Sequence, residues 1–324
     1  MILALRALGV GDLATAVPAL RALRAAHPDQ ALALAAPAWL TPLVDLVGGV
    51  DRIVPAAGLD PLDRPDPPPD LAVNLHGRGP QSHRLLAATR PRRLLAFANP
   101  DAGHADGPDW RPDEHEVDRW CRLLDWYGIP ADRTDLALRR PPAGRTPTGV
   151  SVVHPGSKIP AKRWPAGRFA ALARALAGRG HRVVVTGSAD ERELAGRVAR
   201  RAGLAPDAVL AGRTDLGGLA ALVAHARLVV SGDTGVAHLA TGYGTPSVVL
   251  FGPAPPARWG PPPGRRWHRA LWVGEHGRGG REGDWSASVG VEPDLALAAI
   301  GVGEVLAAVA DVEQAVRVAG AVTA

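Results

Sequence analysis

The chain has 324 residues, of which 46% are hydrophobic and 21% are charged, a composition typical of a globular protein with more than one domain. Its formal net charge is +5, but its basic residues are scattered and do not form the dense blocks that bind nucleic acid, so we expect no nucleic-acid partner. The single cysteine, Cys121, excludes an intrachain disulfide and a cysteine-based metal cluster.

The first half of the chain predicts an α/β domain. Short apolar runs alternate with helical patterns, which is the order of a parallel sheet covered by helices. The expected strands are ILALRAL at 2–8, ALALAAP at 31–37, RIVP at 52–55 and LAVNLHG at 71–77, with a helix over 12–26. In EHEVDRWCRLLDWYG, at 114–128, apolar residues recur at helical spacing, which predicts another helix.

The second half repeats this order after a boundary. The segment RRPPAGRTPTG, at 139–149, is rich in Pro and Gly, as linkers are. Expected strands follow at 150–156, 181–187, 226–232 and 245–252, with helices over 164–180 and 302–318. We therefore expect an N-terminal domain at 1–142, a linker at 143–149, a C-terminal domain at 150–300 and a closing segment at 301–324. The segment 276–290 matches no pattern.

The first glycine-rich loop, LGVGDLATAVP, permits two functions. Gly9, Gly11 and Ala14 satisfy the dinucleotide fingerprint G-x-G-x-x-A, so a dehydrogenase is one alternative. That fingerprint also expects an acidic residue at the end of the second strand, and ALAAPAW has none there. Asp12 could act as the N-cap of the following helix or as a carboxylate that accepts a proton from a hydroxyl.

A second glycine loop, SGDTGVAH at 231–238, leads from a strand into a helix. Thr234, Gly235 and the next backbone N–H groups would lie at a helix N-terminus, which favours an anion. His238 lies one turn into that helix. This arrangement predicts a diphosphate site.

The loop HPGSKIPAKRWP, at 154–165, holds Lys158 and Lys162, the only lysines of the chain. A lysine ammonium is a compact charge that suits a phosphate oxygen, whereas arginine suits planar, bidentate partners. Since ligands bind beyond the carboxyl ends of parallel strands, this loop and the second glycine loop should contribute to the same edge of the sheet.

Three motifs together resemble glycosyltransferase family 9, the heptosyltransferase family. GDLATAVPALRAL is similar to its opening G-D segment, HPGSKIPAKRWP to its K-x-W-P loop, and SGDTGVAHLATGYGTPSVVLFGP to its D-T-G-x-x-H-L-A signature. The resemblance spans nearly the whole chain. It implies an α/β structure with the GT-B fold, in which two Rossmann-like domains with parallel sheets face each other across a cleft.

The resemblance also implies an inverting sugar transfer without metal or cofactor. The donor would be a nucleotide diphosphate sugar such as an ADP-heptose, and the acceptor a hydroxyl of a glycan, glycolipid or small natural product. By matching positions, Asp12 would be the general base. The implied donor site consists of Ser157, Lys162, Asp233, Thr234, Gly235 and His238. Two alternatives stay open, a sugar-nucleotide epimerase of the same fold and a non-catalytic nucleotide-sugar-binding protein.

Further candidates come from the ends of the other expected strands. Those for phosphate contacts are Gly11, Lys158, Gly187 and Thr214, and those for acceptor contacts are Asn74, His76, Gln81, Ser82 and His115. The opening MILALRALGVGD lacks the features of a signal peptide, and no apolar run is long enough to span a bilayer. We expect a cytoplasmic monomer with at most peripheral membrane contact.

Overall fold

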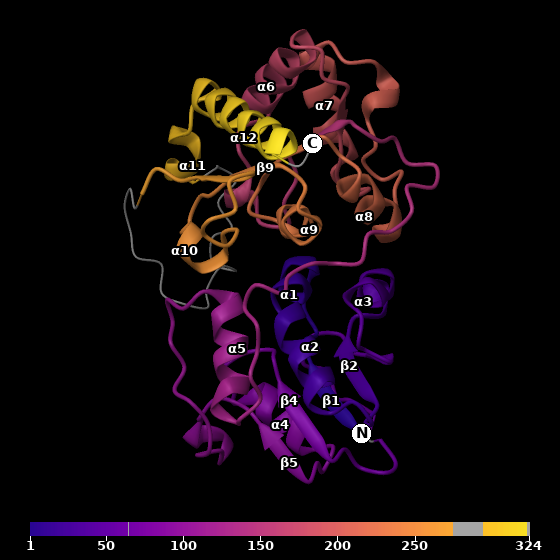
Figure 1. Ribbon diagram of the computed structural model, residues 1–324, viewed down its shortest axis with the longest axis vertical. Helices are drawn as coiled ribbons and strands as arrows, with labels where there is room; N and C mark the ends of the chain where they lie inside the picture. Colours follow the sequence, from indigo (N-terminus) through magenta and orange to yellow (C-terminus); the bar gives the residue numbers. More distant parts are fainter. Residues whose placement is uncertain (64, 275–293, 323–324) are drawn as a thin grey trace. The chain divides into compact units, whose positions relative to one another are not determined.

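The computed structural model describes residues 1–63, 65–274 and 294–322. Its internal contacts divide the chain into two compact units, Met1–Arg139 and Arg140–Ala324 (Figure 1). The division falls just before the predicted linker at 143–149. The unassigned segment 276–290 lies outside the described residues.

The first unit is built on a parallel five-stranded sheet with the order β3-β2-β1-β4-β5. The strands are β1 Ile2–Leu5, β2 Leu32–Ala36, β3 Arg52–Pro55, β4 Leu71–Asn74 and β5 Arg93–Leu95. The central strand β1 pairs with β2 on one side and β4 on the other. Every residue of these three strands is buried, as their nearly continuous apolar sequences predict for a parallel sheet.

The helices of the first unit are α1 Val10–Thr15, α2 Val17–Ala26, α3 Thr41–Val47, α4 Gln81–Ala87 and α5 Glu116–Trp126, with short η1 Ala38–Leu40 and η2 Pro100–Ala102. The single helix predicted over 12–26 is wrong, because α1 and α2 are separate helices that meet at Ala16. The N–H of Ala16 donates to the Leu13 carbonyl at 3.1 Å and closes α1. Pro18 then lies in the first turn of α2, where a missing N–H is tolerated.

The second unit has a parallel five-stranded sheet with the order β10-β9-β8-β6-β7. The strands are β6 Ser151–His154, β7 Val183–Val185, β8 Leu228–Gly232, β9 Ser247–Leu250 and β10 His268–Leu271. The first four lie within predicted segments. Neither β10 nor β5 was predicted, because each is a partly exposed edge strand without the continuous apolar run of a buried strand.

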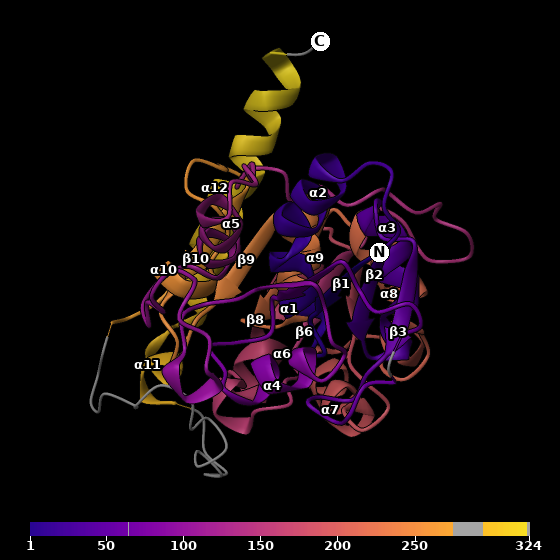
Figure 2. The same cartoon turned by 90° about the horizontal axis from the view of Figure 1, so that it is seen from below.

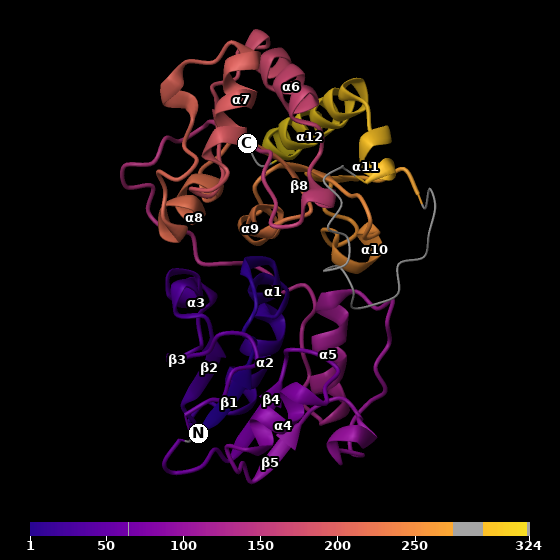
Figure 3. The ribbon, with the colours of Figure 1, turned by 180° about the vertical axis from the view of Figure 1, so that it is seen from behind.

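The helices of the second unit are α6 Ala166–Gly178, α7 Arg192–Ala202, α8 Leu216–Ala224, α9 Gly235–Tyr243, α10 Pro256–Trp259, α11 Leu295–Ala299 and α12 Val302–Val322, with short η3 Pro160–Lys162 and η4 Pro206–Ala208. Figure 3 shows α12 beside α6, and Figure 2 shows the length of α12. Val305, Val309 and Val312 of α12 are completely buried in a core shared with α6, α7 and the sheet. The closing helix is therefore part of the second unit. Among the described helices, none is both long and apolar enough for a membrane crossing.

Candidate functional site

The lysine loop that follows β6 is held in place by its tryptophan. Trp164 is buried, packs edge-on against Phe169 at 5.0 Å between ring centroids, and donates from Nε1 to the Ile300 carbonyl at 3.0 Å. The Ala161 carbonyl accepts from the N–H of Asp294 at 3.1 Å. The K-x-W-P sequence therefore places Lys162 two residues before a packed anchor that holds the end of the loop.

Lys162 belongs to a cluster of three ionisable side chains at the end of β8. Its Nζ lies 2.8 Å from Oδ2 of Asp233, and Nε2 of His238 lies 3.7 Å from the other carboxylate oxygen. Burial opposes ionisation of Asp233, but the imidazole of His238 and the ammonium of Lys162 outweigh it and hold the pKa of this carboxyl below its usual range. An ionised carboxylate thus orients both basic side chains.

Gly232 allows β8 to approach the lysine loop. A Cβ added at this residue would lie 3.0 Å from the carbonyl oxygen of Lys162, which is closer than ordinary van der Waals contact. The glycine before Asp233 therefore lets the two loops meet, as the shared sheet edge predicted.

The N-terminus of α9 has an unused hydroxyl. Thr234 is the N-cap, and N-cap hydroxyls usually accept a hydrogen bond from the first turn of the helix. Here Thr234 Oγ1 is buried and has no hydrogen-bond partner among the described residues. Gly235 begins the helix with no side chain in the way of a ligand. The hydroxyl and the helix N-terminus form a suitable place for an anion.

The other candidate residues of the second unit lie outside this cluster of three ionisable side chains. Ser157 is buried, and its Oγ accepts from the N–H of Ile159 at 3.2 Å, which shapes the lysine loop. Lys158 is exposed on the same loop. Gly187 follows β7, and Thr214 precedes the N-cap of α8. The contacts thus join Lys162, Asp233 and His238 directly, next to the start of α9.

In the first unit, the N-cap of α1 is Gly9, and Asp12 lies three residues after it. The predicted role of Asp12 as the N-cap residue is therefore wrong. Asp12 nevertheless satisfies the start of the helix, since its Oδ2 accepts from the N–H of Gly9 at 3.0 Å. Its Oδ1 lies 3.4 Å from Nη2 of Arg6, and 27% of its side chain is exposed. The carboxylate is therefore fixed on both sides but still reaches solvent.

His76 follows β4 and lies within electrostatic reach of Asp12. Burial and then the positive charge of Arg6 lower the pKa of His76 to about 4, and Asp12 acts in the opposite direction. The imidazole is therefore neutral near pH 7. Its Nδ1 is buried without a hydrogen-bond partner among the described residues.

The remaining acceptor candidates differ in exposure. Asn74 and Ser82 are buried, and Asn74 Nδ2 donates to Ser82 Oγ at 2.9 Å. Both residues use their polar atoms within the unit and shape the loop after β4. Gln81 is exposed at the first residue of α4. His115 caps α5, since its Nδ1 accepts from the N–H of Val117 at 3.2 Å.

Two charged residues near Asp12 were missed by the sequence analysis. Arg6 and Glu116 are buried, and Nη2 of Arg6 lies 3.2 Å from Oε2 of Glu116. The signal was present in ILALRAL, where a single arginine interrupts an apolar run. A charge at such a position is rarely buried unless it is paired.

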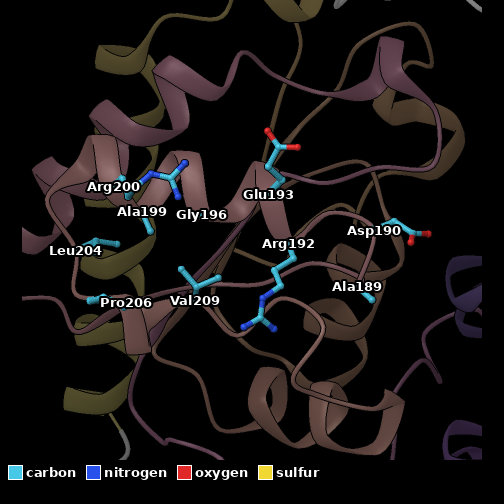
Figure 4. A pocket seen from close by; sticks show the side chains of 10 residues that line it. All are labelled: Ala189, Asp190, Arg192, Glu193, Gly196, Ala199, Arg200, Leu204, Pro206 and Val209. Carbon is cyan, nitrogen blue, oxygen red and sulfur yellow. The ribbon is translucent and has the colours of Figure 1, made fainter.

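A pocket of about 660 Å³ lies on the second unit against α7 and η4 (Figure 4). Its lining residues all fall between Ala189 and Val209, and none of them is a predicted site residue. Within the described ranges, no three His, Cys, Asp or Glu side chains gather closely enough to hold a metal ion.

The family model of glycosyltransferase family 9 (heptosyltransferase) matches residues 109–274, just over half of the chain. The chain belongs to glycosyltransferase family 9. The matched residues include Lys162, Asp233 and His238, whereas Asp12 precedes them.

A curated relative agrees with this family membership. Lipopolysaccharide heptosyltransferase 1 of Pseudomonas aeruginosa is 38% identical over 150 residues, which cover 44% of this chain and 41% of that protein. The sequence match therefore spans less than half of the relative's length.

Two solved structures of family 9 proteins resemble the chain along nearly its whole length. The ADP-heptose lipopolysaccharide heptosyltransferase II of Escherichia coli aligns with a TM-score of 0.75 and 22% identity, covering 97% of this chain and 98% of that one. A family 9 protein of Veillonella parvula aligns with a TM-score of 0.75 and 21% identity, covering 95% of each chain. The predicted fold class, α/β with the GT-B fold, is confirmed.

Proposed function

We propose that this family 9 protein is an inverting glycosyltransferase that moves a sugar from a nucleoside diphosphate sugar to an acceptor hydroxyl. The observation that carries the proposal is the contact of Lys162 and His238 with ionised Asp233 beside the unused hydroxyl of Thr234. A lysine and a helix N-terminus are a suitable combination for a diphosphate, which gains charge as it leaves the sugar.

On the donor side, the bond between the anomeric carbon and the diphosphate oxygen breaks, and the electron pair leaves with the diphosphate. Lys162 and the first N–H groups of α9 stabilise that new charge more strongly in the transition state than in the bound donor. Asp233 is ionised and would repel a phosphate, so its proposed role is to orient Lys162 and His238.

On the acceptor side, Asp12 accepts the hydroxyl proton while the hydroxyl oxygen bonds to the anomeric carbon. Attack opposite the leaving diphosphate inverts that carbon in one displacement. The carboxylate is suited to this role because it is partly exposed and fixed by the N–H of Gly9. His76 is neutral, and it is our first candidate for a hydrogen bond to the acceptor.

We further propose an ADP-heptose donor and a lipopolysaccharide acceptor, because the relatives from P. aeruginosa and E. coli are named for these compounds. In this mechanism the positive charge of Lys162 and the α9 N-terminus do the work that a metal ion does in other glycosyl transfers. The peripheral membrane contact, the monomeric state and the cytoplasmic location stay predictions.

The test is to incubate the full-length protein with ADP-heptose, with and without a heptose-free lipopolysaccharide core, and with and without EDTA. ADP release and the mass of the acceptor are measured. We expect ADP release only with acceptor, a mass gain of one heptose, and no effect of EDTA. Conversion of the donor sugar without acceptor would instead identify an epimerase. Nucleotide binding without any turnover would identify a non-catalytic binding protein.

A further inference from the structure

Arg6 holds both the main chain and the side chain of Asp12. It follows β1 and is 1% exposed. Its Nε donates to the Asp12 carbonyl at 3.0 Å, and its Nη2 lies 3.4 Å from Asp12 Oδ1. That carbonyl is available because the N–H of Ala16 donates to Leu13 at the end of α1. The guanidinium therefore restrains the residue that carries the carboxylate at two points.

Glu116 at the start of α5 holds Arg6 in turn. It is 6% exposed, and its Oε2 accepts from Arg6 Nη2 at 3.2 Å and from Trp120 Nε1 at 2.9 Å. Its other oxygen, Oε1, pairs with Arg119, which is 2% exposed. The Arg6 guanidinium also lies over the Trp120 ring, 4.5 Å from its centroid. α5 thus supplies a buried, hydrogen-bonded support for Arg6.

In the ion pairs found among the described residues, the charges balance when Asp12 is included. Arg6 and Arg119 contribute two positive charges, and Glu116 and Asp12 contribute two negative ones. Burying a charge without a partner is costly, so each member depends on the others. Asp12, at 27% side-chain exposure, is the member that reaches solvent.

We propose that Arg6 and Glu116 are positioning residues that fix the Asp12 carboxylate for proton removal from the acceptor. The inference rests on the proposed role of Asp12. Arg6 acts by direct contact with Asp12, and Glu116 acts through Arg6. Loss of the positioning should therefore lower turnover, while donor binding to the second unit stays intact.

The test compares Glu116→Gln with a matched control, Glu114→Gln. Glu114 lies just before α5 and pairs with Arg122 of that helix at 2.6 Å. The hydrogen bonds and ion pairs of Arg6 and Asp12 do not include Glu114. Using ADP-heptose and a heptose-free lipopolysaccharide core, we expect Glu116→Gln to lower kcat by about 10-fold, since a misplacement of a reacting group by about 1 Å can cost about 100-fold. The KM for ADP-heptose should stay unchanged, and Glu114→Gln should keep the wild-type kcat even if both variants melt at lower temperature.

A second comparison separates positioning from a general loss of structure. Because Glu116 acts through Asp12, adding Glu116→Gln to Asp12→Asn should not lower the residual rate further. Arg6→Lys, which keeps the charge but loses the planar fork, should lower kcat as Glu116→Gln does. The positioning role would be overturned if Glu116→Gln lowered kcat by the same factor in the wild type and in Asp12→Asn, or if Glu114→Gln lowered kcat as much as Glu116→Gln does. Either result would leave the proposed transferase function unaffected. Absence of acceptor-dependent transfer in the wild type would overturn the proposed function and this inference together.

Discussion

Lys162 owes its position to the carboxylate of Asp233, which lies 2.8 Å from its ammonium. In the proposed mechanism this ammonium reaches the donor diphosphate. Lys162→Ala should weaken ADP binding by about 10-fold or more, because a hydrogen bond to a charged group contributes roughly 1.5–3 kcal/mol. Isothermal titration calorimetry with ADP measures this loss.

Lys158 provides the comparison on the same loop. It is exposed, whereas Lys162 is held by a buried carboxylate, so Lys158→Ala should lose less ADP affinity. Equal losses in the two variants would mean that the general charge of the loop, and not the held ammonium, binds the diphosphate.

The sequence predicts a site residue well when a local pattern marks it, and poorly when its role depends on a contact with a distant residue. Lys162, Asp233 and Asp12 follow strands, and the rule that ligands bind at the carboxyl ends of parallel strands places them at the sheet edges. The ion pair of Arg6 with Glu116 joins residues 110 positions apart. The lone arginine in ILALRAL indicates a buried charge, but no local pattern identifies its partner, because the pair forms only in the folded unit, where α5 packs beside α2.

At the scale of elements, α12 completes the core of the second unit. Val309 is completely buried, while Val316 on the same helix is 41% exposed. Val309→Ala should lower the free energy of unfolding by about 2 kcal/mol, since two methyl groups leave the core and a cavity stays behind. Val316→Ala should change it by less than about 0.5 kcal/mol. Urea denaturation monitored by tryptophan fluorescence measures both, and equal effects would contradict the packing of α12.

The edge strand β10 brings a buried histidine into the sheet, and this makes stability depend on pH. Burial, and then the positive charge of Arg265, lower the pKa of His268 from 6.5 to about 4. Between these values the unfolded chain binds the proton and the folded chain does not. Stability is therefore lost as the pH falls from 6.5 towards 4, by up to about 3 kcal/mol for this group.

His268→Gln removes this contribution. Urea denaturation at about pH 7 and about pH 4.5 should show a smaller loss of unfolding free energy in the variant than in the wild type. The same loss in both proteins would mean that His268 does not titrate in this range.

Most of the strands that the sequence predicts are buried, although the partly exposed edge strand β3 also lies where expected. The inner strands β1, β6 and β8 each contain consecutive apolar residues and lie where expected. The edge strands β5 and β10 escape prediction because one or both faces are partly exposed. The break between α1 and α2 also escapes prediction. Pro18 lies in the first turn of α2, but the sequence alone does not show whether such a proline begins a new helix or follows the first turn of an existing one.

At the scale of the whole molecule, the family signal and the proposed base lie in different parts of the chain. The family model matches residues 109–274, which contain the lysine loop and the start of α9 but not Asp12. The structural likeness to the E. coli heptosyltransferase II covers 97% of the chain, including the first unit. The GT-B fold therefore extends beyond the matched segment, and the role of Asp12 is the claim that most needs a direct test.

That test compares the wild type with Asp12→Asn in transfer from ADP-heptose to a heptose-free lipopolysaccharide core, together with ADP binding. Asparagine keeps the shape of the side chain but cannot take the proton from the acceptor. We predict that kcat falls by about 100-fold or more while ADP affinity is unchanged, in line with the contribution of a general base. A variant that transfers heptose at the wild-type rate would contradict the mechanism.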